Sequence, residues 1–366
     1  MKRIYLLEPY LTGSHQRWAE GLVRHSGHQI RLIGRPGRFW KWRMHGAAVS
    51  MAGEVNQLPP PDLILATDML DVATFRALCR HRCPVALYFH ENQITYPWSP
   101  TDEDVPLQRD RHYGWINYVS ALAADAIAFN SHYHQRSFLG ALPDFLKVFP
   151  DDQVPDTVDT ITGKSKVIPL GVDLPSLPPS TRAPGPPILL WNHRWEYDKG
   201  PAAFFGVCRR LKEAKVPFRL IVLGEHTQRY PQEFHTARGE FSRQILHWGY
   251  AEDRATYWQL LRMADLMPVT SRQDFFGISA VEGMHAGAWP LLPDRLAFPE
   301  HLPPDCDGVL YRGEEELAAR CVDLLREGSL PESAALREHI RQYRWERMIG
   351  KYDAWLEECC DRPLLP

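Results

Sequence analysis

The sequence has no long hydrophobic run. A bilayer-spanning helix needs about 20 consecutive apolar residues, and no stretch of the 366-residue chain approaches that length. The apolar run near the N-terminus covers only residues 4–7, which is too short for the core of a signal peptide. We therefore expect a cytoplasmic protein with no membrane partner.

The chain also lacks the cysteine patterns of disulfide scaffolds and zinc sites. Its seven cysteines are odd in number and form no CxxC pair, which suits a reducing compartment and matches no zinc spacing. The net charge is only −3, so bulk charge does not hold this protein on nucleic acid or on a membrane. Any polyanion that it binds must meet a local basic patch.

The residues that are present fit an α/β protein with two domains. Apolar residues make up 44% and charged residues 24% of the chain, and a chain of this length usually needs more than one core. Short apolar strands alternate with amphipathic stretches, which is the rhythm of parallel, doubly wound sheets. The expected strands are residues 3–7, 29–33, 63–66, 85–89, 126–129 and 167–170, then 188–191, 219–223, 245–248, 266–269 and 289–292.

A stretch rich in proline and glycine, residues 171–187, separates the two halves and is the expected linker. Apolar side chains recur at helical spacing through residues 336–359, which predicts one helix there. We expect a first Rossmann-like domain at residues 1–175, a second at 176–335, and a C-terminal segment, 336–366, that crosses back to the first. The two domains are expected to face a cleft.

An acidic, glycine-containing segment follows the expected strand 266–269 and opens a helix. Free backbone N–H groups at a helix start near Gly277 favour an anion such as a sugar diphosphate, which glycine lets approach closely. Glu282 can accept hydrogen bonds from ribose hydroxyls, and Asp274 can accept them from a sugar. The alternative is an amphipathic helix with a solvated Glu282 and a turn at Gly277.

Two cations, Arg194 and Lys199, occupy the loop after the first strand of the second half. Open α/β sheets bind ligands at this edge. Two cations there can neutralise the charge on a departing nucleotide diphosphate in place of a divalent metal. We therefore expect no cofactor and no metal requirement. The alternative is a surface loop with two solvated cations.

In order and spacing, residues 192–200 and 274–283 resemble the second domain of retaining GT-B glycosyltransferases of the glycogen-synthase and mannosyltransferase type. One departure is Asp274, where many relatives carry Glu, so the identity of the donor sugar stays open. The resemblance implies a set of donor-binding groups: Arg194 and Lys199 on the diphosphate, Glu282 on the ribose, Asp274 on the sugar, Tyr250 on the base, and the amides of Phe276, Gly277 and Ile278 on sugar and phosphate.

Two polar segments follow strands of the first half. Gly13, Ser14 and His15 come after the first strand and open a helix. Gly13 permits close approach of a donor, and Ser14 either binds it or only caps the helix.

The second segment, His90-Glu91-Asn92, comes after the expected strand 85–89. Three polar groups at a strand end favour a binding role over a structural one. In the binding role, His90 orients the acceptor or the donor sugar, and Asn92 binds a hydroxyl.

Residues 7–18, 36–44 and 89–97 together look like the tRNA-queuosine mannosyltransferase family, and the resemblance covers most of the chain. It implies GDP-mannose as donor and the cyclopentenediol of queuosine, in the anticodon of a tRNA for aspartate, as acceptor. The acceptor-binding residues that follow from this resemblance are His15, Arg38, Trp40, Lys41, Trp42, Arg43, Glu91 and Asn92.

Cations and aromatic residues alternate within residues 35–43, a combination that binds single-stranded loops through phosphate contacts and base stacking. The alternative is that the tryptophans pack in a core while the cations stay solvated. The cations are Arg35, Arg38, Lys41 and Arg43, the aromatic residues are Phe39, Trp40 and Trp42, and Arg109 and His112 are candidates for an extended basic rim.

These parts predict transfer with retention, in which the acceptor hydroxyl attacks from the face that the nucleotide leaves and a phosphate oxygen takes its proton. The expected catalytic residues are His90, Arg194, Lys199 and Asp274. Three rivals stay open: a glycosyltransferase acting on a lipid or polysaccharide, a non-catalytic RNA-binding protein of the same fold, and a hydrolysing nucleotide-sugar epimerase.

Overall fold

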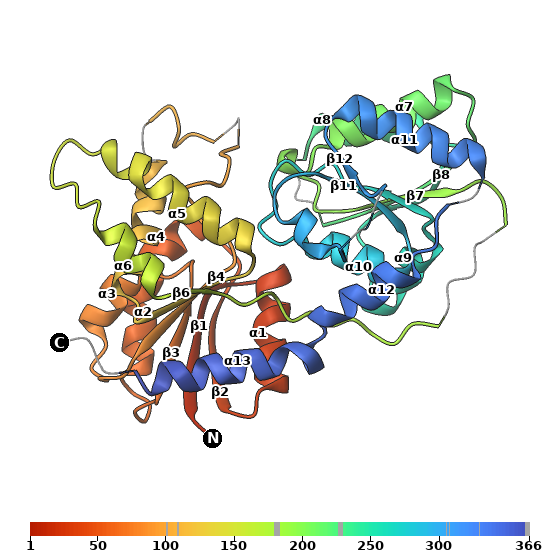
Figure 1. Cartoon of the computed structure of the whole chain (residues 1–366). Coiled ribbons are helices and arrows are strands. Elements are labelled where there is room, and N and C mark those ends of the chain that lie inside the picture. Colours follow the sequence, from red (N-terminus) through yellow and green to blue (C-terminus); the bar gives the residue numbers. More distant parts are fainter. Residues whose placement is uncertain are drawn as a thin grey trace. The chain divides into compact units, whose positions relative to one another are not determined.

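A computed structural model describes residues 1–99, 102–107, 110–178, 184–225, 230–304, 306, 308–328 and 330–362. It divides into two compact units, coloured along the chain in Figure 1. Unit 1 comprises Met1–Asp173 and Tyr343–Pro366, and unit 2 comprises Leu174–Gln342. Within the described ranges, no helix has both the length and the apolar composition to cross a membrane.

Unit 1 is built on a parallel sheet of six strands in the order β2-β1-β3-β4-β5-β6. Its central strands β3 and β4 are buried at every position, because helices cover both faces of a parallel sheet. The elements of this unit are β1 Arg3–Leu11, α1 Gly13–His25, β2 Gln29–Pro36, α2 Trp40–Val55, β3 Leu63–Thr67, α3 Val72–Leu78, β4 Val85–Phe89, α4 Arg111–Ala123, β5 Ala126–Phe129, α5 His132–Lys147, α6 Thr157–Gly163, β6 Ser165–Val167 and α13 Trp345–Cys360.

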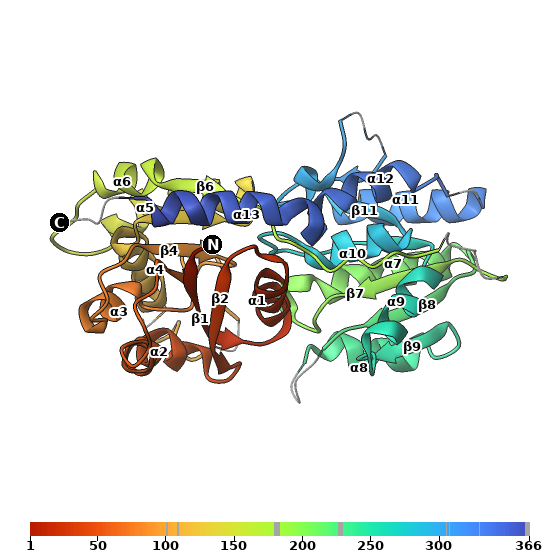
Figure 2. The ribbon, with the colours of Figure 1, turned by 90° about the horizontal axis from the view of Figure 1, so that it is seen from below.

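The two faces of this sheet carry different helices. Leu87 and Phe89 belong to a large buried cluster that includes residues of α2, α3, α4 and α5. Tyr88, between them in sequence, points to the other face, where its ring stacks on Trp18 of α1 at a centroid distance of 4.6 Å. Trp18 donates to the Tyr352 hydroxyl of α13 over 2.9 Å. Figures 1 and 2 both show α13 lying along this unit.

Unit 2 has a second parallel sheet of six strands in the order β12-β11-β10-β7-β8-β9. The chain order reverses between β7 and β10, and ligands of open α/β sheets bind at such a switch point. Its elements are β7 Ile188–Asn192, a 3-10 turn Tyr197–Lys199, α7 Pro201–Glu213, β8 Arg219–Leu223, α8 Gln232–Glu240, β9 Ile245–Gly249, α9 Arg254–Met263, β10 Leu266–Pro268, α10 Ile278–Ala286, β11 Trp289–Pro293, a 3-10 turn Phe298–His301, β12 Leu310–Tyr311, α11 Glu314–Glu327 and α12 Ala334–Ile340.

The prediction of one continuous helix over residues 336–359 is wrong. Helix α12 ends at Ile340, a 3-10 turn covers Arg341–Tyr343, and α13 begins at Trp345 after an extended residue. The physical reason is a backbone contact: the Tyr343 carbonyl accepts from the Val172 N–H over 2.8 Å, and Arg344 bridges to Val172. The helical periodicity of the sequence continues through this break and does not reveal it.

Two short strands also differ from the predictions. Strand β6 covers Ser165–Val167, two residues before the predicted start, and β12, Leu310–Tyr311, has no predicted counterpart. Both are edge strands fixed by pairing with β5 and β11, so their bounds depend on a distant partner.

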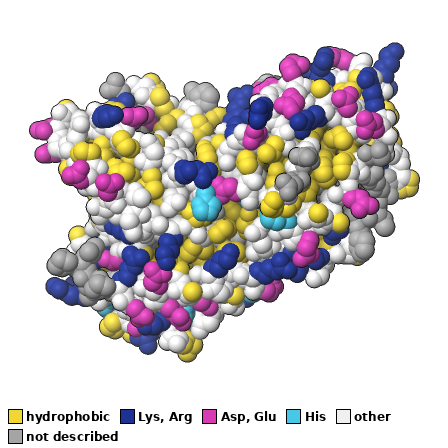
Figure 3. All heavy atoms as spheres, in the orientation of Figure 1, with side chains coloured by type: hydrophobic (Ala, Val, Ile, Leu, Met, Phe, Trp, Pro, Cys, Tyr) yellow, Lys and Arg dark blue, Asp and Glu magenta, His cyan; other side chains and the backbone are white. Residues whose placement is uncertain are grey.

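Acidic and basic side chains are interspersed on the face drawn in Figure 3, with hydrophobic side chains visible between them. This distribution agrees with the small net charge. Attraction of a polyanion must therefore depend on local groups of cations.

Candidate active site

The loop after β10 starts α10 in the predicted way. Gly277 is the N-cap residue and has a φ of 83°, a conformation that favours glycine. A Cβ at this position would meet the Phe298 ring at 2.8 Å. The first helical bonds run from Ala280 and Val281 to the Gly277 carbonyl, so the amides of Gly277 and Ile278 lie ahead of these bonds at the positive end of the helix.

Glu282, on α10, is buried and held by two donors of α9. The Tyr257 hydroxyl donates to Oε2 over 2.6 Å, and the Arg254 guanidinium donates to Oε1 over 3.1 Å. The side chain is 4% exposed, so the alternative of a solvated glutamate is wrong. Each carboxylate oxygen can accept more than one hydrogen bond, which leaves Glu282 able to accept from a ligand as well.

Lys199, at the end of the 3-10 turn after β7, is buried in a network of acceptors. Its ammonium lies 2.7 Å from the Gln273 carbonyl, 3.1 Å from Asp274 Oδ1 and 3.1 Å from Asp198 Oδ2. An ammonium has three N–H donors, so a phosphate would have to replace one of these acceptors. The alternative of a solvated lysine on a surface loop is wrong.

The charges of this network stabilise one another. Burial by itself lowers the pKa of Lys199, but the Asp274 and Asp198 carboxylates more than offset this and raise it above its ordinary value. Burial raises the pKa of Asp274, whereas the Lys199 charge lowers it, and the net shift is downward. Lys199 and Asp274 are therefore both ionised near neutral pH, and Lys199 fixes the orientation of the carboxylate.

Arg194 and Tyr250 are accessible to a ligand. The Arg194 side chain is 52% exposed and pairs with Glu196 over 3.2 Å. Tyr250 follows β9 and is 67% exposed. Unlike Lys199, the Arg194 guanidinium can reach a diphosphate while most of its surface faces solvent.

Several residues that support this site were not predicted. The His301 ring donates to the Phe276 carbonyl, which fixes the loop ahead of α10, and the Asn192 amide donates to the Ser279 carbonyl over 2.8 Å. Burial lowers the pKa of His301 to about 4. No local pattern marks Arg254 or Tyr257 as partners of Glu282, because α9 and α10 meet only in the fold.

In unit 1, Gly13 and Ser14 begin α1 as expected. Gly13 has a φ of 53°, and no atom lies within 4 Å of the position that a Cβ would take. Ser14 is exposed, and the N-cap residue of α1 is Thr12. The alternative that Ser14 caps the helix is therefore wrong, and its hydroxyl faces solvent at the helix start.

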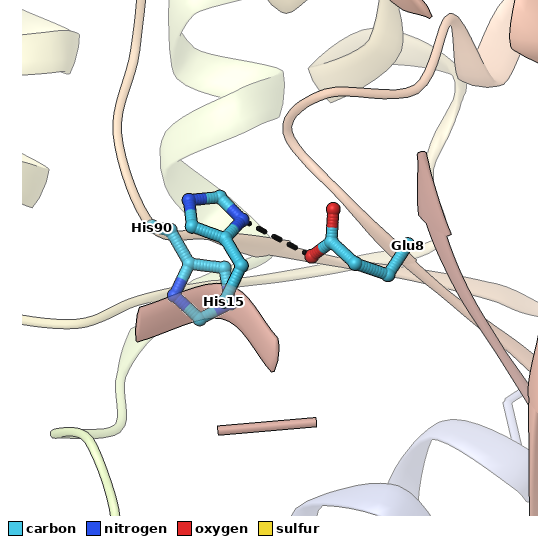
Figure 4. A group of neighbouring side chains, drawn as sticks. All are labelled: Glu8, His15 and His90. Atoms are coloured by element: carbon cyan, nitrogen blue, oxygen red, sulfur yellow. Dashed lines mark hydrogen bonds and ion pairs between the residues drawn. The ribbon is translucent and has the colours of Figure 1, made fainter. Parts of the chain in front are cut away.

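His15 and His90 meet in a buried group with Glu8, a residue of β1 that was not predicted (Figure 4). His15 Nδ1 donates to Glu8 Oε2 over 3.1 Å, and the two imidazole centroids lie 4.4 Å apart. Asp68, after β3, accepts from the backbone N–H of His90 over 2.7 Å. The group thus lies where β1, β3 and β4 end, at the switch point of this sheet.

The donor atoms of Glu8, His15 and His90 lie within 4.8 Å of one another, a ligand set that some zinc and iron sites share. A metal ion would have to take the Glu8 and His15 atoms that already bind each other, so we assign this group to hydrogen bonding. The chain also has two Asp-x-Asp triplets. One is residues 102–104, whose two aspartates pair with Lys41, and the other, 305–307, lies partly outside the described residues.

The two neighbours of His90 in sequence differ in role. Asn92 is fully buried, and its Oδ1 accepts from the N–H groups of Ile94 and Thr95 over 3.1 and 2.9 Å. This bond pattern holds a tight turn, whereas Asn92 Nδ2 is buried without a hydrogen-bond partner among the described residues, so its role in binding a hydroxyl stays a prediction. Glu91 is half-buried and accepts from Gln93 over 2.9 Å.

The basic and aromatic residues within 35–43 divide into an inner set, which packs or pairs within unit 1, and an outer set, which is more exposed. Trp40 packs beside the buried cluster of Met44 and Tyr113. Lys41 pairs with Asp102 over 2.6 Å and with Asp104. For Trp40 the alternative of core packing is correct, and Lys41 is not a solvated cation because two carboxylates neutralise it. Both side chains are only partly exposed, and their contact with the acceptor stays a prediction.

The outer set is the α2 N-terminal surface, which comprises Arg38, Phe39, Trp42 and Arg43. Trp42 is 68% exposed and Phe39 is 78% exposed, with a φ of 53° that is unusual for a phenylalanine. Among the described residues, no carboxylate pairs with Arg38 or Arg43. This surface therefore combines free cations with accessible aromatic rings.

The remaining basic candidates are placed as follows. Arg35 pairs with Glu54 over 2.8 Å, which neutralises it. The exposed His112 ring stacks on His45 at 4.6 Å. Arg109 lies outside the described residues.

Two protein-family models match this chain. One is described as tRNA-queuosine alpha-mannosyltransferase N-terminal and matches residues 3–172. The other is described as glycosyl transferases group 1 and matches residues 176–343. Together they cover most of both units.

The curated proteins that are similar in sequence include two mannosyltransferases. The tRNA-queuosine alpha-mannosyltransferase of Drosophila melanogaster is 29% identical over 340 residues, which cover 88% of this chain and 87% of that protein. The GDP-mannose:cellobiosyl-diphosphopolyprenol alpha-mannosyltransferase of Xanthomonas campestris is 26% identical over 194 residues, and the chain spans about half of its length (51%).

Solved structures share the architecture at low identity. HepE of Anabaena in complex with UDP has a TM-score of 0.65 at 15% identity, covering 97% of this chain and 100% of that one. The sucrose-phosphate synthase of Thermosynechococcus elongatus has a TM-score of 0.70 at 14% identity, covering 97% and 98%. The predicted fold class, an α/β protein of the GT-B type, is confirmed.

Proposed function

We propose that this chain, a hexosyltransferase with the GT-B fold, transfers mannose from GDP-mannose to the cyclopentenediol of queuosine in the anticodon of tRNA-Asp, with retention and in the cytoplasm. Its two halves match the N-terminal model of tRNA-queuosine alpha-mannosyltransferases and the model of group 1 glycosyl transferases. The observation that carries this proposal is the match of unit 1, over residues 3–172, to the family's N-terminal domain. Unit 1 is the part that distinguishes the acceptor, since the match of unit 2 is to a broad group of glycosyltransferases.

Unit 2 binds the donor in this proposal. Its site lies after β7 and β10, the two strands at the switch point. The amides at the start of α10 and the Arg194 guanidinium bind the diphosphate, and Glu282 accepts from the ribose. Asp274, held by Lys199, accepts from the sugar, and the exposed Tyr250 covers the base.

Unit 1 binds the tRNA in this proposal. The α2 N-terminal surface offers Trp42 and Phe39 for stacking and Arg38 and Arg43 for phosphates, which is how unpaired loops are held. His15 and His90 bind hydroxyl groups at the strand ends. Trp40 and Lys41 have structural roles in this proposal, and Asn92 Nδ2 is available to a hydroxyl group.

The chemical step needs charge stabilisation more than a nucleophile of the protein. As the nucleotide leaves, negative charge grows on the diphosphate, where Arg194 and the dipole of α10 stabilise it. A leaving phosphate oxygen takes the proton of the attacking hydroxyl, so atoms and charge balance without a covalent enzyme intermediate. The proposal includes no metal, and EDTA should leave the rate unchanged.

The test is incubation of the purified protein with GDP-mannose and queuosine-containing tRNA, followed by mass spectrometry of the nucleosides. A hexose found on queuosine, and absent with tRNA that lacks queuosine, supports the proposal. If GDP-mannose binds but no hexose reaches any tRNA, the proposed acceptor is wrong. A tRNA panel then tests the choice of tRNA-Asp.

A second acceptor class is a lipid-linked saccharide, which the name of the Xanthomonas protein states for that protein. Its match covers only about half of the chain (51%), and the free cations of the α2 N-terminal surface favour a polyanion. We therefore retain tRNA as the proposed acceptor.

A further inference from the structure

Two buried histidines are in contact in unit 1, and only one of them binds a carboxylate. The rings of His15 and His90 lie 4.4 Å apart and are tilted by 40°. His15 donates to Glu8, which is fully buried and also accepts from the Tyr10 N–H over 2.9 Å. Two positive charges this close in a buried place repel each other, so near neutral pH the pair carries a single positive charge, one proton more than two neutral rings.

The surrounding charges decide which ring carries that proton. His15 faces three carboxylates: Glu8 from β1, Asp68 from the end of β3 and Glu91 from the end of β4. Burial lowers the pKa of His15, but these carboxylates, Glu8 foremost, raise it to about 9.

His90 lies in the opposite environment. It faces two other imidazoles, His15 and His134 of α5, and burial together with the charge of His15 holds its pKa well below the ordinary range. Burial also raises the pKa of Asp68, so part of the negative charge near His90 is neutralised.

The ring of His90 is fixed in place but has an unused atom. Its N–H and carbonyl are bound by Asp68 and by Asn130, the latter over 2.8 Å, and its ring packs against Trp18 and Tyr88 at 4.5 and 4.9 Å. Its Nε2 is buried and has no hydrogen-bond partner among the described residues. A buried polar atom of this kind costs free energy until a partner arrives.

We propose that Glu8 holds the proton of this pair on His15, and thereby keeps His90 neutral so that its Nε2 hydrogen bonds a hydroxyl group of a substrate. This inference rests on the proposed function, which supplies two hydroxyl-bearing substrates, the sugar of the donor and the diol of the acceptor. Glu8 is then a positioning residue, because it acts through the two histidines. Under a purely structural role, Glu8 would only fix the turn from β1 into α1 and would leave the pH dependence of the reaction unchanged.

The protonation order can be measured on the wild-type protein without any substrate. Proteins labelled with 15N in histidine are titrated by NMR between pH 6 and 8, with His15→Gln and His90→Gln used to assign the signals. The expected result is a charged His15 and a neutral His90 throughout this range. A charged His90, or two neutral rings at pH 7, overturns the proposal.

The kinetic consequence is tested with Glu8→Gln, which keeps the shape of the side chain and removes its charge. In the wild-type enzyme His90 stays neutral over the whole range, so this pair should leave kcat/KM unchanged as the pH falls from 8 to 6. In Glu8→Gln the proton is no longer held on His15, so His90 takes a share of it as the pH falls. An acid limb should therefore appear, with kcat/KM falling roughly 2- to 5-fold between pH 8 and 6. A higher KM for tRNA assigns the hydroxyl to the acceptor, and a higher KM for GDP-mannose assigns it to the donor.

The matched control is Glu20→Gln on the exposed face of α1, which removes one carboxylate from the same unit and should neither create an acid limb nor change the rate. Thermal unfolding of Glu8→Gln shows whether it remains folded. A folded Glu8→Gln with the wild-type pH profile overturns the inference, whereas a wild-type enzyme without transfer contradicts the proposed function itself. The NMR titration tests the protonation order whether or not transfer is observed. The inference about Glu8 is also overturned if a divalent metal binds and displaces the His15 proton.

Discussion

The two units hold their predicted site residues in different ways. In unit 2 Lys199 and Asp274 come from the loops after β7 and β10, the strands at the switch point, and the structure pairs them directly over 3.1 Å. In unit 1 the predicted set divides: His15 and His90 meet in a buried group, Trp42 stands exposed on α2, and Lys41 is neutralised by Asp102 and Asp104. Predicted residues that follow strand ends therefore lie together in the structure, whereas a run of suitable residue types can divide between buried and exposed positions.

Replacement of Lys199 tests how much its buried ion pairs stabilise unit 2. Lys199→Met leaves the buried carboxylates of Asp198 and Asp274 without their shared partner, and losing one side of a buried ion pair costs about 3 to 5 kcal/mol of unfolding free energy. Urea unfolding measures this loss. Lys212→Met, which removes an exposed lysine of α7, should cost less than about 0.5 kcal/mol. Equal effects of the two variants would mean that the Lys199 network contributes nothing.

The donor role of unit 2 is tested at Glu282. Hydrogen bonds to a charged group contribute about 1.5 to 3 kcal/mol, so Glu282→Ala should weaken GDP binding roughly 10- to 150-fold. Isothermal titration with GDP measures the affinity without any acceptor. An unchanged affinity in a folded variant would remove Glu282 from the donor site.

The acceptor role of unit 1 is tested on the α2 N-terminal surface. A stacked base contributes about 1 to 3 kcal/mol, so Trp42→Ala should weaken tRNA binding roughly 5- to 150-fold. The control is Val49→Ala, which removes another exposed apolar side chain of α2 and should leave binding unchanged. Filter binding at fixed salt compares the two. If both variants bind tRNA like the wild type, this surface is not the interface.

The smallest expected effect concerns the partners of Glu282. Tyr257→Phe removes a donor that orients the Glu282 carboxylate but does not itself bind the nucleotide, so only part of the about 1.5 to 3 kcal/mol of this bond should be lost from binding, and GDP affinity should weaken roughly 2- to 12-fold. Tyr311→Phe removes a buried hydroxyl that donates to the Val269 carbonyl over 2.6 Å in the same unit. Tyr311→Phe should lower the free energy of unfolding by about 0.5 to 1.5 kcal/mol and leave GDP affinity unchanged. Loss of affinity in both variants would point to general loosening of unit 2.

Much of the fold follows from the sequence because parallel strands are buried on both faces and appear as short apolar runs. Strands β4 and β8 have the predicted bounds, and α10 begins at Ile278 as expected. The break between α12 and α13 could not be predicted, because it depends on the contact of Tyr343 and Arg344 with Val172, about 170 residues away in sequence.

The candidate site shows the same limit. Gly277 and Glu282 lie on one helix, so their spacing fixes their relation. Glu8 and His90 are 82 residues apart, and only the order of β1, β3 and β4 in the sheet brings them together. The sequence also could not predict which tryptophan of α2 is exposed. Trp40 and Trp42 are alike in sequence, and only the packing of Trp40 beside Tyr113 distinguishes them.

We propose that unit 2 binds the nucleotide donor and unit 1 binds the tRNA. The most direct measurement is the affinity of Glu282→Ala and of Trp42→Ala for both ligands, GDP and queuosine-containing tRNA, under one set of conditions. We expect that Glu282→Ala loses GDP affinity alone and that Trp42→Ala loses tRNA affinity alone. Weaker tRNA binding by Glu282→Ala, weaker GDP binding by Trp42→Ala, or unchanged affinity of either variant for both ligands would contradict this division between the two units.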